Sequence, residues 1–584
     1  MKKILLYALA ASLMFCACDL TKIPEDSVSP DSYFKTETDF ELWCNAFYTQ
    51  FSTADNLAGM NADDVVDNNP QDCIKGSRSA ATESWSWTQL RNINYLLEHS
   101  EQCADEAVRA KWEAVAYFFR AYFYSIKVRN YGDVPWYDEV IGSADTDNLQ
   151  KARDSRGYVM YQVMKDYDRA IAGLPSTRDV ATVNKWTALA FKSRAALYEG
   201  TFRKYHGIAD ETVDGTITGS DGILISADWF LAQAAEAAGK LIDEGPYTLA
   251  EGEDIYREMF VDESANTSEW ILARVYGDIY TQNVRHNSVS EHQGFTKRFM
   301  NHYLLKDGSR ITSREGYETE TLAQEVKDRD PRLAQTVYCG LSTVKGDKLE
   351  YLTCVTGYQP IKFESAKAKN SSGKGTFDFP LMRLPEVMLN YAEAKAELGT
   401  LTQADLGKTI NKIRARAGVT KALSLDEANA DPDPLLESYY PHVNSGANKG
   451  VILEIRRERT VEFPLEGLRQ WDMFRWAEGS LLVNHDSPYL GVYFPGPGVY
   501  DMNGDGKNDT EIYTGEKTST LSNVYKIGTD IFLSDDTSGN VVAYKNVDYT
   551  WQEGRDYLWP IPAAQRVLNH NLTQNPGWAD GLDF

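Results

Sequence analysis

A nine-residue stretch near the C-terminus has the residue types of a calcium-binding loop. It reads Asp501-Met502-Asn503-Gly504-Asp505-Gly506-Lys507-Asn508-Asp509, so oxygen-bearing side chains occupy positions 1, 3, 5 and 9, Lys507 occupies position 7 and a glycine occupies position 6. A hard cation such as Ca²⁺ requires several oxygens converging from a tight turn. Position 12 is Ile512, and the nearest acid is Glu511. Because the closing carboxylate is displaced, a structural calcium site and a plain Asx- and Gly-rich turn both stay open.

A second stretch, residues 454–476, is dense in charge. Its first part, Glu454 to Glu462, alternates acids with arginines, and Arg469 to Trp476 adds further arginines and tryptophans. One interpretation is an acid or anion site. The other is a helix whose charges pair three and four residues apart and tie it to neighbouring elements. We favour the second interpretation, which predicts a structural role.

Catalytic motifs with a specific spacing do not occur in the sequence. There is no phosphate-binding Gly-rich loop, no His-Glu-x-x-His and no Gly-x-Ser-x-Gly. His286, Glu291 and His292 lie close together but lack metal-ligand spacing. Carboxylates are so abundant that the sequence alone does not single out a glycosidase-type pair.

Charge and aromatic content narrow the class of partner. The chain has 584 residues, with 85 acidic against 60 basic side chains and a formal net charge of -25. Such a chain repels polyanions, which argues against nucleic-acid binding. Tyr and Trp, at 34 and 13, outnumber the 22 Phe about two to one. Because both combine an apolar face with a polar edge, they suit half-wetted surfaces as well as cores.

The first residues are a targeting segment. Lys2 and Lys3 precede an apolar run from Ile4 to Phe15, which is shorter than the roughly 20 residues that span a bilayer. Ala17 supplies the small residue that precedes a cleaved bond. We therefore expect residues 1–17 to be a lipoprotein signal peptide and Cys18 to be the lipidated N-terminus that anchors the protein to a membrane.

The other cysteines do not form a recognisable framework. Cys339 and Cys354 flank a predicted hairpin turn at Gly346-Asp347, which leaves a disulfide and buried thiols both open. The remaining ones are scattered, without metal-site spacing: Cys44, Cys73 and Cys103.

The helical periodicity of the apolar residues predicts helices, and most of the candidate residues above lie on or beside them. Apolar residues recur at the 3.6-residue period in 40–51, 107–129, 159–174, 184–199, 227–244, 384–398, 406–417 and 453–478. Paired Ala-rich helices of this length resemble tetratricopeptide-type packing. Gly-, Ser-, Asn- and Asp-rich stretches at 275–300, 310–325, 420–450 and 485–550 are interpreted as long functional loops. The prediction is a mainly α protein, with an N-terminal helical region over 18–250 and a loop-rich region over 251–584.

Four groups of motifs occur in a fixed order along nearly the whole chain. They are Arg120–Tyr124 with Tyr131–Pro135, Arg383–Val387 with Tyr391–Ala394 and Asn411–Gly418, Glu458–Phe463 with Arg469–Trp476, and Leu558–Pro562 with Thr573–Trp578. Together, behind a lipoprotein signal, they resemble the SusD/RagB family of nutrient-binding outer-membrane lipoproteins. Pro385 and Pro464 depart from the family pattern, and a proline there either starts a helix or kinks it.

The resemblance implies a SusD-like α-helical fold with tetratricopeptide-type helix pairs, long loops and a few short β-hairpins. It implies a lipoprotein on the exterior face of the outer membrane that caps a TonB-dependent, SusC-like transporter as its lid. Such proteins deliver glycans, or in some members peptides, and are binders rather than enzymes. A secreted α-helical glycoside hydrolase and a helical scaffold that binds only protein are the rival classes.

Two aromatic segments are the candidate ligand surfaces. A Trp or Tyr ring covers the C–H face of a sugar, while amide, carboxylate and guanidinium groups bond its hydroxyls. The two rings of Trp85 and Trp87 face the same way only if that segment is extended, and packing at a helix start is their alternative role. The first candidate surface consists of Trp85, Trp87, Gln89 and Asn92. The second consists of Tyr276, Tyr280, Asn283 and Arg285.

Overall fold

The computed structural model describes residues 33–60, 62–81, 85–213, 222–252, 254–338, 354–365, 369–443, 446–483 and 489–584. The predicted signal peptide, the lipidation site Cys18, Cys339 and the turn at 346–347 lie outside these residues, so those expectations stay predictions. In the described ranges, no helix combines the length and the apolar character that crossing a bilayer requires.

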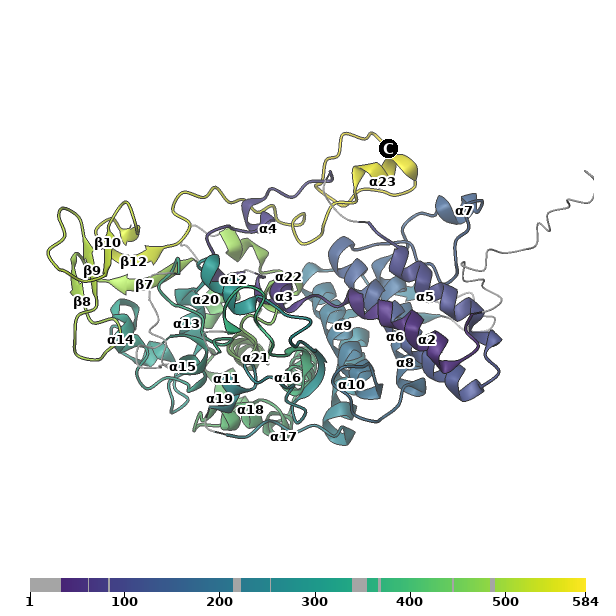
Figure 1. Ribbon diagram of the computed structural model, residues 1–584, viewed down its shortest axis with the longest axis horizontal. Coiled ribbons are helices and arrows are strands. Elements are labelled where there is room, and N and C mark those ends of the chain that lie inside the picture. Colours follow the sequence, from purple (N-terminus) through teal and green to yellow (C-terminus); the bar gives the residue numbers. More distant parts are fainter. Residues whose placement is uncertain are drawn as a thin grey trace, which may run out of the picture.

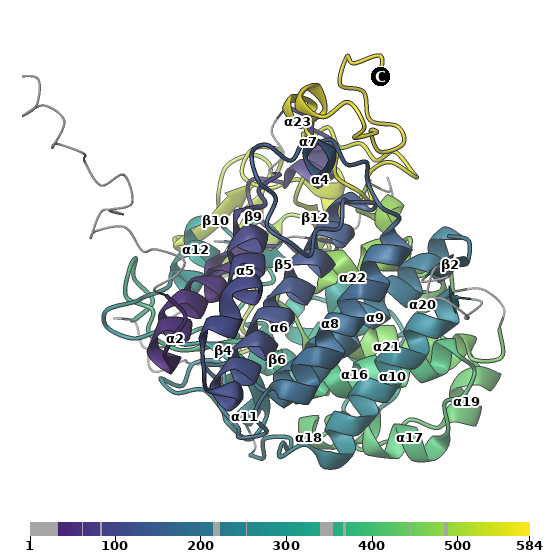
Figure 2. The ribbon, with the colours of Figure 1, turned by 90° about the vertical axis from the view of Figure 1, so that its right-hand side faces the viewer.

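The N-terminal part is a layer of long helices. Its members are α5 (Thr88–His99), α6 (Glu106–Tyr131), α8 (Arg156–Gly173), α9 (Lys185–His206) and α10 (Ala227–Glu244). Helix α6 packs against α5 and α8, and α9 packs against α8 and α10, and Figure 2 shows these helices side by side. The expected tetratricopeptide-like pairing is confirmed. Shorter helices accompany the layer: α2 (Glu37–Asn45), η2 (Ala46–Gln50), α3 (Ala54–Ala58), α4 (Asp72–Lys75), η3 (Ser100–Gln102) and α7 (Thr146–Leu149).

Local sequence fixes where the long helices begin and how closely they approach. The Asp105 carboxylate accepts hydrogen bonds from the first backbone N–H groups of α6, and the Asn184 side chain does the same for α9. Gly132, with φ of 73°, ends α6 in a conformation that favours glycine. A Cβ on Gly200 of α9 would lie 2.8 Å from Leu231 Cγ of α10, so this glycine permits the close contact of the two helices.

The C-terminal part is built around α16 (Leu384–Glu397) and α21 (Lys449–Glu462). Helix α16 packs against α9, α10 and α21, which joins the two parts. Pro385 lies in the first turn of α16 and starts it rather than kinking it. The single helix expected over 453–478 is instead α21 and α22 (Arg469–Arg475), since Pro464 cannot continue the first. Likewise, 406–417 divides into α17 (Gln403–Lys408) and α18 (Ile410–Ala417).

The stretches predicted to be long loops contain short elements, which corrects that interpretation. Residues 275–300 include α12 (Val284–Ser290), and strands between residues 490 and 542 form two small sheets. The other short helices are α11 (Ile255–Glu258), α13 (Lys297–His302), η4 (Ile311–Ser313), η5 (Tyr317–Thr319), α14 (Leu322–Glu325), α15 (Arg332–Thr336), α19 (Leu425–Ala430), α20 (Pro434–Tyr439), η8 (Gly479–Val483) and α23 (Ala563–Leu568).

The strands are short and form small sheets. Three two-stranded antiparallel sheets pair β1 (Val65–Val66) with β5 (Gly294–Phe295), β2 (Glu211–Val213) with β3 (Ile223–Ile225), and β4 (Trp270–Arg274) with β6 (Phe379–Arg383). A three-stranded sheet has the order β11 (Leu533–Asp535), β12 (Ser538–Val542), β7 (Leu490–Phe494). Another has the order β10 (Asn523–Lys526), β9 (Thr510–Tyr513), β8 (Gly498–Tyr500). Figure 1 shows the last two sheets at the end of the molecule opposite the long helices.

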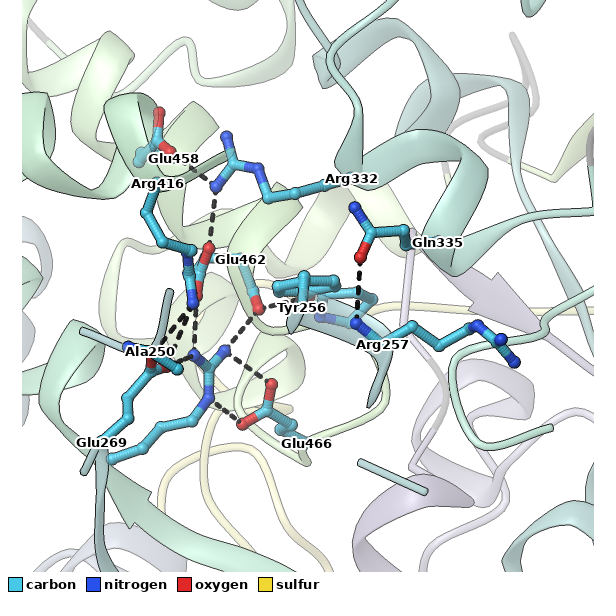
Figure 3. Close-up of polar contacts among 12 residues, drawn as sticks. Ala250, Tyr256, Arg257, Glu269, Arg332, Gln335, Arg416, Glu458, Glu462 and Glu466 are labelled. Atoms are coloured by element: carbon cyan, nitrogen blue, oxygen red, sulfur yellow. Dashed lines mark hydrogen bonds and ion pairs between the residues drawn. The ribbon is translucent and has the colours of Figure 1, made fainter. Parts of the chain in front are cut away.

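A buried ion-pair network, here called the ionic core, holds the C-terminal part together. The Glu462 carboxylate pairs with Arg383 (2.6 Å), Arg332 (2.8 Å) and Arg416. Arg383 also pairs with Glu466 at 2.8 Å and with Glu269 at 3.0 Å. These groups come from β6, α15, α18, α21 and the segments beside them, and Figure 3 shows Glu269, Arg416, Glu462 and Glu466 converging. The acids and arginines of 454–462 are therefore structural, as favoured from the sequence.

Candidate functional site

Trp85 and Trp87 lie at the start of α5, and both are half-buried. Trp87 is the residue that precedes the first turn of the helix, so the pair is not in an extended strand. Their ring centroids are 5.3 Å apart at an interplanar angle of 76°, an edge-to-face contact. The two rings therefore do not form one flat surface, although they remain on the wall of one pocket.

That pocket has a volume of about 580 Å³ and an aromatic wall with a polar rim. Trp85, Trp87 and Tyr137 supply rings. The polar side chains of the lining are Thr88, Arg91, Asn94, Glu139, Asn148, Gln150, Gln565 and Asn569. An apolar ring face beside groups that bond hydroxyls is what a sugar requires. We call this site the tryptophan pocket.

Gln89 and Asn92 do not line the tryptophan pocket, which corrects their predicted role. The Gln89 side chain donates to Thr49 Oγ1 at 3.0 Å, and the Asn92 carbonyl accepts from Trp43 Nε1 at 2.9 Å. Because α5 begins at Thr88, successive residues turn by about 100°. Arg91 and Asn94 face the pocket, whereas Gln89 and Asn92 lie on other faces. Asn94 is itself engaged, donating to the carbonyls of Tyr137 and Glu139.

Lys127 of α6 lies beside the rings of both tryptophans. The Lys127 ammonium lies 5.3 to 5.5 Å from the centroids of four rings, those of Trp85, Trp87, Phe123 and Tyr131. In the described part of the chain, no carboxylate lies within ion-pair distance of it, and burial lowers its pKa to about 8. Attraction between the ammonium and the ring faces offsets part of the cost of burying this charge.

The second predicted surface is only partly assembled. Tyr276 and Tyr280 stack at 5.0 Å with an angle of 3°, but Tyr276 is buried and its hydroxyl accepts from the Ala54 N–H. Asn283 is engaged with Asp55 and Gly373 through its N–H and its side-chain oxygen. Arg285 is buried in an ion pair with Glu364, so it cannot contact a ligand there. Tyr280, 48 % exposed, is the ring of this set that remains accessible.

The 501–509 loop connects β8 to β9, and its carboxylates are occupied within the loop. Asp501 accepts from the N–H groups of Gly504, Asp505 and Gly506, and Asp509 accepts from those of Met502 and Asn503. Asp505 accepts from the Lys507 N–H. Glu511, the acid nearest to the closing position, is bonded to Thr518 and Ser519. Among the described residues, no group of three acidic, His or Cys side chains could hold a metal ion. The hydrogen bonds within the loop are those of Asx turns, and the calcium site stays a prediction.

A larger cleft of about 990 Å³ lies between the helical layer and the C-terminal part. Residues of α3, α6, α9, α16 and α22 line it, and in Figure 1 α3 and α22 lie between the two parts. An aromatic ridge separates it from the tryptophan pocket, with Trp85 against Tyr131 (4.8 Å) and Tyr131 against Trp559 (5.7 Å). Trp559 and Trp471 line this cleft. Both occur in the quoted motifs, but sequence reasoning did not assign them to a site.

The layer of paired helices with small peripheral sheets defines a tetratricopeptide-like helical protein. A model of the SusD family matches residues 252–578, and a second model, described as starch-binding associating with outer membrane, matches residues 30–197. The chain belongs to the SusD family, whose members are carbohydrate-binding proteins associated with the outer membrane. The predicted family and the mainly α fold are thereby confirmed.

Individual relatives are more distant. A SusD-like protein P2 of Formosa agariphila is 27% identical over 225 residues, which is 35% of this chain and 44% of that protein. The chain thus spans less than half the length of this curated relative. A SusD-like protein of Bacteroides fragilis has a TM-score of 0.67 at 19% identity, covering 95% of this chain and 100% of that one. A SusD-like carbohydrate-binding protein of the same species has a TM-score of 0.66 at 18% identity, covering 92% and 99%.

Proposed function

We propose that the protein captures an oligo- or polysaccharide at the exterior face of the outer membrane and delivers it to a TonB-dependent, SusC-like transporter, which it covers as a lid. A lipid on Cys18 would anchor it, and it performs no chemistry on the glycan. The observation that supports glycan binding most directly is the tryptophan pocket, where two half-buried indole rings adjoin a rim of amide, carboxylate and guanidinium groups. Membership of a carbohydrate-binding family agrees with it.

Affinity electrophoresis of the purified protein through a panel of polysaccharides tests the proposal. We expect retardation by at least one glycan, and its loss in Trp85→Ala, because a stacked aromatic ring contributes about 1–3 kcal/mol at such sites. The matched control is Trp229→Ala, since Trp229 is also half-buried but packs on α10 against Phe230 and Tyr161. A flat response to every glycan combined with peptide binding would overturn the sugar assignment.

Two further measurements address delivery and the absence of catalysis. Pull-down from outer-membrane extracts should recover a TonB-dependent barrel, and recovery of no barrel would contradict the lid. Incubation with a retarding polysaccharide should release no reducing ends. Release that a single Asp or Glu substitution abolished would instead establish a glycoside hydrolase.

A further inference from the structure

Arg129, in the last turn of α6, is an unbalanced cation in the wall of the large cleft. Its guanidinium carbon lies 3.7 Å from the centroid of the Trp471 ring. In the described part of the chain, no carboxylate lies within ion-pair distance of it. Burial lowers its pKa to about 10, with the Tyr198 and Tyr122 hydroxyls acting in the opposite direction. The group is therefore still charged at neutral pH, without a counter-charge.

The other arginines that line this cleft have acidic partners. Arg194 pairs with Glu386 at 2.6 Å, and Arg459 pairs with Asp472 at 2.9 Å. Arg475 pairs with Asp472 and Glu393. Arg78 lies 3.7 Å from Asp556. These four arginines have acidic partners within the protein. Arg129 is the exception among the arginines of this cleft, so an anion from a ligand can supply its counter-charge.

Two more polar groups of the same wall lack partners. Tyr198 Oη and Gln50 Nε2 are buried and have no hydrogen-bond partner among the described residues. Buried polar groups are nearly always satisfied, so these two are candidates for hydrogen bonds to a ligand in the cleft. Together with Arg129 they supply a cation and two hydrogen-bond donors to one cleft.

Seven carboxylates line the cleft, and five of them pair with basic side chains; the other two lining acids are Asp67 and Glu291, and burial followed by the charge of Asp67 raises the pKa of Glu291. Glu386 and Asp472 are neutralised by the arginines described above. Glu199 is paired with Arg156 and Arg203, and Glu466 is paired with Lys362 and Arg383. Asp72 pairs with Lys75 at the cleft mouth.

We propose that this cleft binds a carboxylate-bearing sugar unit, with the Arg129 guanidinium pairing with the carboxylate and Tyr198 and Gln50 donating further hydrogen bonds. A guanidinium that covers a ring with its face keeps its in-plane N–H groups for acceptors. The Nε–H of Arg129 donates to Asn130 Oδ1 at 3.5 Å, and its two terminal NH₂ groups match a planar carboxylate. The aromatic ridge from Trp85 to Trp559 lies between this cleft and the tryptophan pocket. The choice of a sugar as the carrier of the carboxylate rests on the proposed function.

Titration calorimetry with oligouronides from pectin and alginate, each beside its carboxyl-reduced neutral counterpart, tests this site. We expect the acidic form to bind the wild-type protein about tenfold or more tightly than the neutral form, as hydrogen bonds to a charged group imply. Arg129→Gln should abolish that preference and keep the neutral affinity. Arg129→Lys, which keeps the charge but not the fork, should keep part of it. The matched control is Lys75→Gln, which removes an already paired cation from the same cleft and should keep the full preference.

The outcomes separate this inference from the proposed function. Neutral and acidic forms bound equally by the wild type, or a preference that survives Arg129→Gln in a variant of unchanged melting temperature, would overturn the Arg129 site alone. An Arg129-dependent preference, combined with affinities for both forms that Trp85→Ala leaves unchanged, would support the site and contradict the tryptophan pocket. Binding of neither form would overturn the Arg129 site, and a flat response across the polysaccharide panel would in addition overturn the proposed function. Tighter Arg129-dependent binding of carrageenan-derived sulfated oligosaccharides would show that the anion is a sulfate and not a carboxylate.

Discussion

The ionic core and the aromatic ridge differ in whether their buried charges have opposite charges beside them. In the ionic core, Glu462 faces three arginines, and Arg383 faces three carboxylates. Beside the ridge, Lys127 lies among four rings, and in the cleft Arg129 stacks on Trp471; among the described residues neither has a carboxylate within ion-pair distance. A charge balanced within the protein stabilises one packing of its elements, whereas a charge left without an opposite can be completed by a ligand. The first region therefore specifies the fold, and we assign binding to the second.

Breaking the ionic core should have the largest effect. Glu462→Gln removes the carboxylate that three buried arginines share, and we expect a loss of about 3–5 kcal/mol in the free energy of unfolding because these arginines stay buried with one counter-charge fewer. Urea denaturation measures it. The control is Glu437→Gln, which breaks the exposed pair with Lys449 and should cost about 1 kcal/mol or less. Equal costs for the two variants would show that the network is not the source of stability.

The Lys127→Met variant should change the free energy of unfolding by less than Glu462→Gln does, and in the opposite direction. The folded pKa of Lys127, about 8, lies below its ordinary value of 10.5, so between these pH values the unfolded chain binds the extra proton and stability rises with pH. The variant lacks this rise and should be about 1–3 kcal/mol more stable than the wild type at pH 7, with the gap closing by about pH 10.5. Urea denaturation at both pH values measures the difference. A variant less stable than the wild type at pH 7 would show that the four rings attract the ammonium more than burial disfavours it.

Sequence periodicity predicted the extents of the long helices, but it did not predict which residues line the candidate site. The extents of α6, α8 and α10 agree with prediction because apolar spacing and end signals lie within each segment. Gln89 was assigned to the ligand surface because it follows two tryptophans, but the start of α5 at Thr88 turns it toward Thr49. The contact of Arg129 with Trp471 joins segments far apart in the chain, and no local pattern predicts that these two residues meet. Long-range packing decides which polar groups stay unpaired.

Calcium should have the smallest effect, because the 501–509 loop already has internal partners for its carboxylates. The Asp501 oxygens bond three backbone N–H groups, and Glu511 is held by Thr518 and Ser519 rather than being available to close a cation site. We expect 10 mM CaCl₂ to shift the melting temperature by less than about 1 °C relative to EDTA, since a site occupied at tenfold over its Kd would add about 1.4 kcal/mol and a larger shift. Differential scanning calorimetry makes the measurement, with MgCl₂ as the ionic control. A rise in melting temperature of about 2 °C or more that is specific to calcium and absent in Asp505→Asn would support the calcium interpretation. The loop carboxylates would then be balanced by a bound cation, whereas those of the ionic core are balanced by arginines of the protein.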